Sequence, residues 1–363
     1  MSPRPPGARA LACIVASLAL LLPIGVEGLA ATAGAGAQSG TPDDPYAAFA
    51  TFPERVSIAG AEAGPRCDAT QVPGLKPLYE GRSVSRLYDR LFAPGPRVPY
   101  LNEHVPQGLT AWPNWDRRGN PLLLVGMYRP NSLSYLVGIS PRTGRHVGTV
   151  LVDESHLGGI GILGEWLITQ DNALPGGQPA VRRYRLADLS AAMLEAGQGG
   201  YMPYLPATGS PQAVPGASFM TVADGSLWAG RYRRATNGRM FRYTVDSAGR
   251  LHRAKGRWTV PPRTQGVLVT PRHFLFASSD GVLAGRLRAY RRTADDRASE
   301  PIGCLFTPSL PQNLAVYGGK VFAVFESGAA RFDRGDYANR IARLHMADIG
   351  VLDRVVDPLG RAD

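Results

Sequence analysis

The sequence predicts an all-β domain folded as a β-propeller of five blades, with one or two short helices in its loops. Three observations lead to this prediction. Most of the chain consists of short apolar or alternating runs rich in Val, Tyr, Phe and Leu. Turn pairs such as Asp224-Gly225 and Asn237-Gly238 separate these runs. The pattern repeats at a period of about 50 residues with three or four strands per unit, which is typical of a propeller.

Each repeat begins with a short motif in which a polar residue precedes a glycine or an apolar strand. The five starts are Pro106–Thr110, His156–Ile160, Ala217–Met220, Thr264–Val267 and Pro311–Leu314. The second unit is the longest because it contains a helix expected at Ala187–Ala196 and the loop after it. Each small sheet has two apolar faces, and packing the sheets radially buries both of them.

Such a ring has to be closed by one strand from elsewhere in the chain. Either the segment near residues 67–100 or the end of the chain supplies it. Within Tyr79–Phe92, the spacing of Leu87, Tyr88 and Leu91 predicts a short helix. Two alternatives remain open, a sixth blade within residues 67–105 and a large β-sandwich, although a sandwich would not explain the recurring starts.

The first 37 residues are expected to be a secretory signal peptide. Arg4 and Arg9 precede an apolar run, Leu11–Val26, and the small residues Ala35-Gly36-Ala37 follow it. The alternative is a membrane anchor, but the run is shorter than the ~20 apolar residues of a spanning helix and is broken by Pro23. We therefore expect a secreted protein with no transmembrane segment after cleavage. Its expected parts are a signal peptide (1–37), a flexible Ala/Gly/Pro-rich arm (38–66), the propeller (67–352) and a C-terminal tail (353–363).

Two cysteines, Cys67 and Cys304, remain after the signal peptide. In an oxidising compartment they are most simply one disulfide, which would join the start of the folded domain to a late repeat. Two free buried thiols are the alternative.

The net charge of +11 comes mostly from arginine, with lysine only at Lys76, Lys255 and Lys320. The arginines are scattered through strands and turns. Nucleic-acid binders usually gather their charge on one face, so a nucleic-acid partner is not expected. A solvated surface explains the charge, and attraction to an acidic ligand or polymer is the functional alternative.

The starts of the repeats are where we expect a binding site. In a propeller, the innermost strand of each blade lines the central channel, so residues at equivalent strand starts converge on the axis. These residues are Gln107, His156, Ser218, Gln265 and Asn313. They would form either a ligand-binding ring or a set of caps that satisfies backbone groups around a narrow core.

A second layer of polar residues follows the second strand of each repeat. It includes Tyr128, Asp171 beside Gln170, Arg231 and Glu326. Asp171, Arg231 and Glu326 could form a catalytic set with His156. In this set His156 or Glu326 is the base, Arg231 holds an anion and Asp171 assists. Two alternatives remain open: Asp171 and Glu326 could hold Ca²⁺ together with backbone carbonyls, or the charges could form a buried ion-pair network. No other metal or cofactor is required by the sequence.

The remaining histidines are weaker candidates. His104 lies near the first start and could join the site. The others, His146, His252, His273 and His345, are expected at the surface. The sequence contains no Gly-x-Ser-x-Gly elbow, P-loop or His-Glu-x-x-His motif, which argues against an α/β-hydrolase, a P-loop nucleotide enzyme and that type of zinc site.

The chain resembles secreted bacterial β-propeller proteins, a group with glutaminyl-cyclotransferase-like, gluconolactonase-like and uncharacterised members. The resemblance rests on Gln107-Gly108, Gln265-Gly266, His156–Gly159 and Phe325–Ser327 and covers roughly residues 100–350. It concerns the fold, and no complete catalytic set of these families matches the sequence.

These observations predict a monomer with a polar pocket at the channel mouth that binds or transforms a small polar or anionic molecule. If it is an enzyme, the expected reaction is of the hydrolase, lactonase or cyclotransferase type. The alternative is a non-enzymatic extracellular scaffold that binds a protein or a cell-wall polymer.

Overall fold

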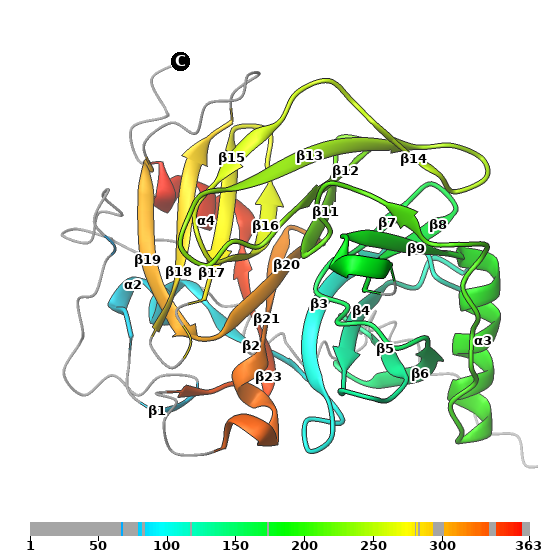
Figure 1. Ribbon diagram of the computed structural model, residues 1–363. Coiled ribbons are helices and arrows are strands. Elements are labelled where there is room, and N and C mark those ends of the chain that lie inside the picture. Colours follow the sequence, from blue (N-terminus) through cyan, green and yellow to red (C-terminus); the bar gives the residue numbers. More distant parts are fainter. Residues whose placement is uncertain are drawn as a thin grey trace, which may run out of the picture. The chain divides into compact units, whose positions relative to one another are not determined.

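The computed structural model describes residues 67, 79–81, 84–116, 118–172, 174–279, 281, 284–292, 301–333 and 339–357. The expected signal peptide (1–37) and arm (38–66) lie outside these residues. Within them, the chain forms five antiparallel sheets of four or five strands and one two-stranded ribbon, and the expected five-bladed β-propeller is confirmed (Figure 1).

The first four blades follow one another along the chain, each with its innermost strand first. The first blade comprises β3 (Val105–Trp112), β4 (Leu122–Tyr128), β5 (Ser134–Ile139) and β6 (His146–Val152). The second comprises β7 (Ile160–Leu163), β8 (Trp166–Asp171), β9 (Ala180–Arg185) and β10 (Gln212–Ala213).

The third blade is the largest, because a fifth strand pairs with its third. It comprises β11 (Phe219–Ala223), β12 (Ser226–Gly230), β13 (Gly238–Val245), β14 (Leu251–Arg253) and β15 (Trp258–Val260). The fourth comprises β16 (Thr264–Val269), β17 (His273–Ser278), β18 (Ala284–Arg291) and β19 (Gly303–Ser309).

The fifth blade closes the ring with a strand from the N-terminal side, as the first of the two expected routes predicted. It comprises β20 (Pro311–Tyr317), β21 (Lys320–Phe325), β23 (Arg343–Asp348) and, on its outer edge, β2 (Ala93–Arg97). Ala93 pairs with Met346 and Pro94 with His345. A short ribbon, β1 (Glu80–Gly81) with β22 (Asn339–Arg340), joins the same two parts of the chain. The described part of 67–105 therefore completes the fifth blade instead of forming a sixth.

Three α-helices accompany the sheets in the described residues. α2 (Arg86–Leu91) lies within the predicted segment, and α3 (Leu186–Gly199) contains the one predicted inside the second repeat. α4 (Ile349–Val356) was not anticipated and crosses the expected boundary at residue 352. Asp348 caps it by accepting a hydrogen bond from the Val351 N–H at 3.0 Å. Three single 3₁₀ turns complete the elements: η1 (Pro175–Gly177), η2 (Glu326–Gly328) and η3 (Ala330–Phe332).

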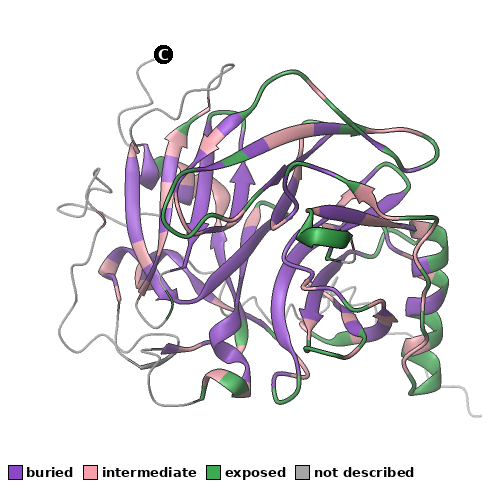
Figure 2. Cartoon of the chain, viewed as in Figure 1, coloured by how far each residue is buried: buried purple, intermediate pink, exposed green. Residues whose placement is uncertain are grey.

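The apolar core is divided among the gaps between blades, as radial packing of two-faced sheets requires. Most residues of the strands are buried (Figure 2), and their apolar side chains form a cluster in each gap. Representative pairs from neighbouring blades, in ring order, are Leu124 with Leu167, Ile168 with Leu227, Trp228 with Phe276, Leu287 with Leu314 and Val324 with Val125.

The inner strands approach one another closely at their starts, and glycine makes this possible. A Cβ on Gly108 would collide with the carbonyl oxygen of Leu157 in the next blade. A Cβ on Gly266 would collide with that of Gln312. The polar-glycine starts recognised in the sequence thus have a steric cause, because only glycine allows such a backbone contact.

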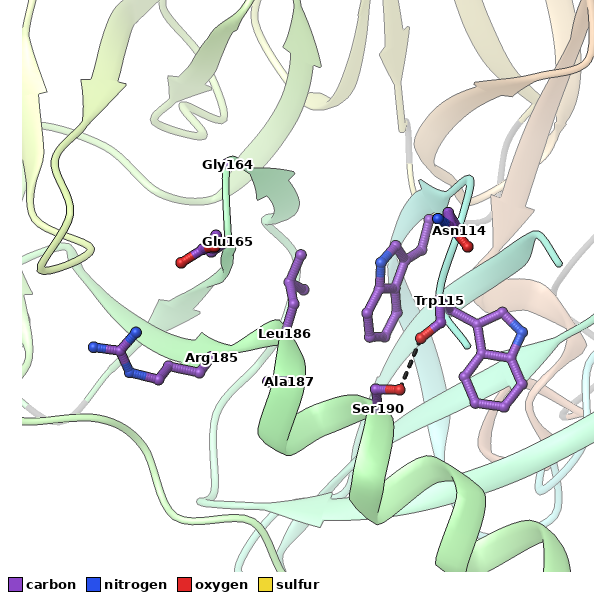
Figure 3. A pocket seen from close by; sticks show the side chains of 9 residues that line it. Asn114, Trp115, Gly164, Glu165, Arg185, Leu186, Ala187 and Ser190 are labelled. Carbon is purple, nitrogen blue, oxygen red and sulfur yellow. Dashed lines mark hydrogen bonds between the residues drawn. The ribbon is translucent and has the colours of Figure 1, made fainter. Parts of the chain in front are cut away.

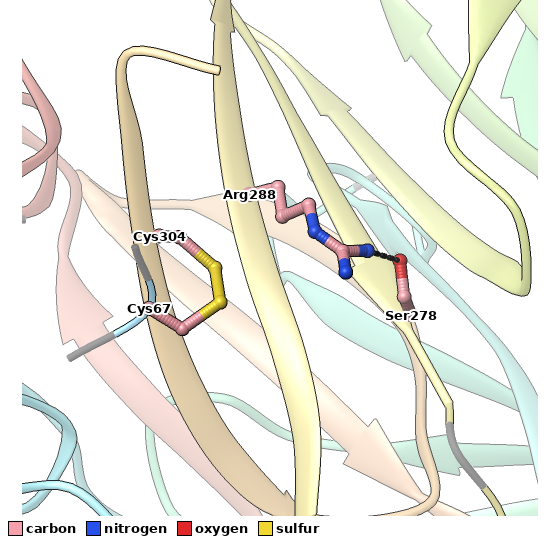
Figure 4. Close-up of a disulfide and its surroundings, with 4 residues drawn as sticks. All are labelled: Cys67, Ser278, Arg288 and Cys304. Carbon is pink, nitrogen blue, oxygen red and sulfur yellow. Dashed lines mark hydrogen bonds between the residues drawn. A yellow bond between two sulfur atoms is a disulfide. The ribbon is translucent and has the colours of Figure 1, made fainter. Parts of the chain in front are cut away.

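The predicted disulfide between Cys67 and Cys304 is confirmed (Figure 4). It joins residues 237 positions apart and fastens the N-terminal side to β19, the outer strand of the fourth blade. No helix in the described residues is both long enough and apolar enough to cross a bilayer.

Candidate functional site

The five inner strands begin at one end of the ring, which we call the mouth. The antiparallel pairing places the ends of the second strands there too: Pro106 at the start of β3 pairs with Met127 near the end of β4. In the fifth blade, Pro311 pairs with Phe325 in the same way. The two layers of polar residues predicted from the sequence therefore lie at one end of the ring.

Glu326 is the ionisable group with the most unusual surroundings at the mouth. It directly follows β21 and is only 9% exposed. The Gln107 side-chain amide donates a hydrogen bond to Oε1 of this carboxyl group. Burial raises the pKa of Glu326 to about 7, although the hydrogen bond from Gln107, the nearby amide of Gln312 and the charge of Arg331 oppose the rise. Near neutral pH the carboxyl group is consequently divided between its protonated and ionised forms.

Arg331, on η3, connects this carboxyl group to two aromatic side chains. Its Nη1 donates to the Tyr128 hydroxyl at 3.0 Å. The Tyr128 ring lies against His156, with 4.3 Å between the centroids and 38° between the planes. Burial, helped by the positive charge of Arg331, lowers the pKa of His156 to about 4. His156 is therefore neutral at physiological pH and can both donate and accept a hydrogen bond.

We call these six residues the Glu326 cluster. Its members come from the first, second and fifth blades and from the turns after β21: Gln107, Tyr128, His156, Gln312, Glu326 and Arg331. Tyr128 and His156 are half-buried, and Arg331 is exposed. The cluster combines a carboxyl group that can exchange a proton, a neutral imidazole, a phenol and a guanidinium group.

β-bulges position the amides at the mouth. The pairing register shifts between Pro106 and Gly108, and again between Thr264 and Gly266, so that Gln107 and Gln265 are the extra residues. A third shift leaves Gln312 and Asn313 unpaired with β21. A bulge redirects a side chain without breaking the strand, and it often occurs beside functional sites.

Asn313 has a capping role. It is fully buried, and its Nδ2 donates at 2.9 Å to the carbonyl oxygen of Met220 on β11. Its Oδ1 accepts the N–H of Leu314 at 2.9 Å. Because β20 and β11 belong to blades that are not neighbours in the ring, Asn313 ties the inner strands together across the axis. Of the other predicted ring members, Ser218 and Gln265 are half-buried at the mouth.

Asp171 lies in an ion-pair network. The carboxylate is buried and lies 3.3 Å from Nε of Arg182, whose Nη1 lies 2.8 Å from Asp153. Asp153 also accepts a hydrogen bond from the Tyr204 hydroxyl at 2.6 Å. This arrangement matches the ion-pair alternative for Asp171. Among the described residues, no group of three or more His, Cys, Asp and Glu side chains is placed to hold a metal ion.

Arg231 is exposed and lines a surface cleft of about 450 Å³ in the third blade. The lining residues are Pro215, Arg231, Arg233, Thr236, Asn237, Gly238, Arg239 and Phe241. None of them belongs to the Glu326 cluster. Of the four residues predicted as a catalytic set, His156 and Glu326 have pKa values that the charge of Arg331 influences.

Two cluster members were missed by the sequence analysis. Gln312 lies inside a recognised repeat start, but Asn313 was predicted as the ring member of that start. The bulge that leaves both residues unpaired cannot be predicted from the sequence. Arg331 lies in the second of two consecutive 3₁₀ turns, and no other repeat has such a pair in its described residues, so periodicity gave no signal for it.

Two histidines expected at the surface are buried, and that expectation was wrong. His273 lies between two carboxylates, 2.5 Å from Asp353 and 2.9 Å from Asp357, and so fastens β17 to the α4 region. His345 shares a hydrogen bond of 2.6 Å with the Tyr88 hydroxyl. His104 is also buried and stacks on Tyr135, with 3.7 Å between ring centroids. His273 and His345 have hydrogen-bonding partners that account for their positions within the fold. Neither buried ring nitrogen of His104 has a side-chain partner of this kind among the described residues.

A second cleft, of about 250 Å³, lies at the end of the ring opposite the mouth. Figure 3 shows the residues that line it. Its walls include Trp112 at the end of β3, the β7–β8 turn at Glu165, and the first turns of α3. Ser190 donates to the carbonyl oxygen of Trp115 at 2.8 Å, which fixes α3 against the loop after β3.

No protein-family model matches the chain, and no curated protein matches it. Solved structures show similarity at the level of the fold. Glutaminyl cyclase from Myxococcus xanthus has a TM-score of 0.40 and 10% identity, over 70% of this chain and 94% of that one. The GH43_1 enzyme from Xanthomonas citri, complexed with xylose, has a TM-score of 0.36 and 10% identity, over 70% and 90%. A putative oxidoreductase (glucose dehydrogenase) from Thermus thermophilus has a TM-score of 0.33 and 14% identity, over 70% and 86%. The resemblance to bacterial propeller proteins concerns the fold alone.

Proposed function

We propose that this chain is an acid–base enzyme that acts on a small polar or anionic substrate at the mouth of the propeller. The observation that carries the proposal is the state of Glu326: a buried carboxyl group, held by an amide, whose pKa is about 7. A general acid–base catalyst works best when its pKa is near the working pH, because it can then both accept and donate a proton.

The other cluster residues have roles that suit acyl chemistry. Glu326 takes a proton from an attacking water, hydroxyl or amine, whose lone pair forms a bond to a carbonyl carbon. The oxyanion that develops is stabilised by Arg331 and the Tyr128 hydroxyl. The carbonyl re-forms as the bond to the leaving group breaks, and Glu326 returns the proton to that group. Ester or lactone hydrolysis and intramolecular cyclisation all follow this course.

His156 and Gln107 are assigned supporting roles. His156, neutral at physiological pH, orients the substrate through a hydrogen bond. Gln107 donates to Oε1 of Glu326 and so keeps the carboxyl group in one orientation, which makes it a positioning residue. Ser218 and Gln265, half-buried at the same end of the ring, are available to bind polar groups of the substrate.

We also propose that the protein works as a monomer outside the cytoplasm. The disulfide supports this location, because disulfides persist in oxidising compartments. The order of charge, apolar run and small residues at the N-terminus supports it independently. N-terminal sequencing of the exported protein would test the expected cleavage before Gln38.

The test is a metabolite screen by thermal shift, followed by NMR detection of turnover for each ligand that stabilises the fold. We expect Glu326→Gln to lower turnover at least ~100-fold while the protein stays folded. Glu195→Gln is the matched control, because Glu195 is an exposed carboxylate on α3 and its replacement should change nothing. Wild-type turnover in both Glu326→Gln and His156→Asn would refute the proposal and favour the non-enzymatic scaffold.

A further inference from the structure

The cleft in the third blade has a composition that the proposed reaction does not use. Three of its eight lining residues are arginines (Arg231, Arg233 and Arg239), and none is acidic. The remaining side chains that bear on recognition are Thr236 and Asn237, which are polar, and Phe241, which is aromatic. The cleft is therefore positively charged, with a small apolar wall and neutral hydrogen-bonding groups.

The backbone around the cleft is held in place by contacts within the chain itself. The Arg231 N–H donates to the carbonyl oxygen of Arg239 at 3.1 Å, which closes the base of the β12–β13 loop. The Arg263 N–H donates to the carbonyl oxygen of Arg233 at 2.7 Å and so attaches the loop to the start of the fourth blade. A Cβ on Gly238 would lie 2.6 Å from the Arg231 carbonyl oxygen, so the two sides of the loop are in tight contact. Anchoring of this kind reduces the entropy lost when a ligand binds.

The choice of arginine indicates the kind of anion. A guanidinium group presents a planar fork of N–H donors that matches the two oxygens of a carboxylate or a phosphate, whereas lysine acts as a point charge. All three cations of the cleft are arginines. Its volume of about 450 Å³ suits a ligand of one or two sugar rings rather than a bare ion.

We propose that this cleft binds a sugar that carries a carboxylate or phosphate group. The arginines hold the oxyanion, Thr236 and Asn237 form hydrogen bonds to hydroxyl groups, and the C–H face of the sugar packs on Phe241. The sugar comes either as a free sugar acid or sugar phosphate, or as a unit of an acidic polysaccharide. This binding is separate from the reaction proposed for the Glu326 cluster and does not depend on it.

The test is isothermal titration of the full-length protein with four probes: galacturonic acid, glucose 6-phosphate, polygalacturonate and neutral galactose. We expect at least one anionic probe to bind, and galactose not to bind. The triple variant Arg231→Ala, Arg233→Ala, Arg239→Ala should weaken that binding at least ten-fold. The matching lysine variant should recover only part of it, because it restores the charge without the fork.

The control removes two exposed arginines at the opposite end of the ring, Arg142→Ala with Arg145→Ala, and should leave binding unchanged. Preference for polygalacturonate over galacturonic acid would identify a polymer unit as the source, and equal binding would identify the free sugar. Full recovery in the lysine variant, equal losses in the control, or no binding of any anionic probe would overturn the proposal. Glu326→Gln should bind these probes like the wild type, so failure here is distinguishable from failure of the proposed reaction.

Discussion

Asp171 and Glu326 occupy corresponding places in two blades and differ in their partners. Each is a buried carboxyl group at the end of a second strand, β8 in the second blade and β21 in the fifth. Asp171 lies 3.3 Å from the guanidinium group of Arg182. Glu326 is held by the neutral amide of Gln107, and the nearest cation that influences it, Arg331, is exposed.

The comparison shows that the partner of a buried carboxyl group decides what that group can do. A guanidinium partner compensates a buried carboxyl group for its lost hydration, so the pair is suited to structure. An amide offers a hydrogen bond without a charge, so burial still disfavours the ionised form and the pKa rises. The same position in the fold thus carries a structural ion pair in one blade and a group that can exchange protons in another.

The largest expected effect is on the stability of Glu326→Gln at alkaline pH. Because the folded-state pKa of about 7 is above the unfolded value of 4.5, the protonated carboxyl group is favoured by folding. The contribution of Glu326 to the free energy of unfolding is fully present below pH ~4.5 and is lost as the pH rises through 7. Gln does not ionise, so the variant should be about 3 kcal/mol more stable than wild type at pH 9 and equal to it at pH 4. Urea unfolding at both pH values measures this, and a pH-independent difference would contradict it.

Asp171→Ala should have the opposite sign. Arg182 loses one of its two carboxylates but keeps Asp153, 2.8 Å away. We expect a loss of about 2 kcal/mol of unfolding free energy, typical of a hydrogen bond to a charged group. Urea unfolding at pH 7 is the measurement. A gain in stability would mean that the two carboxyl groups are not distinguished by their partners.

A smaller effect should follow the removal of the amide that holds Glu326. In Gln107→Leu the carboxylate loses its donor, so the pKa of Glu326 should rise by about one unit above its wild-type value. Gln265→Leu is the matched control, because Gln265 occupies the corresponding bulge of the fourth blade. For each of the two variants, the free energy of unfolding is measured against pH and compared with that of Glu326→Gln. The comparison gives the shift in the pKa of Glu326 in that variant. Equal shifts in the two variants would show that the contact with Gln107 has no special effect.

The smallest effect should follow Arg331→Met. The positive charge of Arg331 lowers the pKa of both Glu326 and His156, so its removal should raise both. Because Arg331 is exposed and screened by solvent, we expect a shift of about half a unit, which decreases at high salt. NMR titration of the His156 ring measures one of the two shifts directly. A downward shift would contradict the arrangement described here.

Much of the fold could be predicted from the sequence because it is local and repeated. Strand patterns, turn pairs and the recurring starts identify five units, and the two cysteines after the expected signal peptide identify a disulfide. The sequence shows that the polar-glycine starts recur, but it does not show why glycine is needed there. The bulges at Gln107 and Gln265, and the backbone contacts that require Gly108 and Gly266, depend on how neighbouring blades pack.

The site was less predictable because partners come from other strands and turns. Asp171 and Glu326 looked alike in sequence, and only the pairing of β8 with β9 brings Arg182 to Asp171. His273 was expected at the surface because its partners, Asp353 and Asp357, lie 80 or more residues away in the α4 region. Helix α4 itself has apolar residues at Leu352, Val355 and Val356, a spacing that could have indicated its buried face.

The most direct test is a ¹³C NMR titration of the Glu326 side-chain carboxyl group, with Glu326→Gln used to assign its signal. Ionisation at pH about 7 is the predicted result. A midpoint close to 4.5, the ordinary value for glutamate, would show that Glu326 is a simple carboxylate at neutral pH and would remove the basis for acid–base catalysis at the mouth.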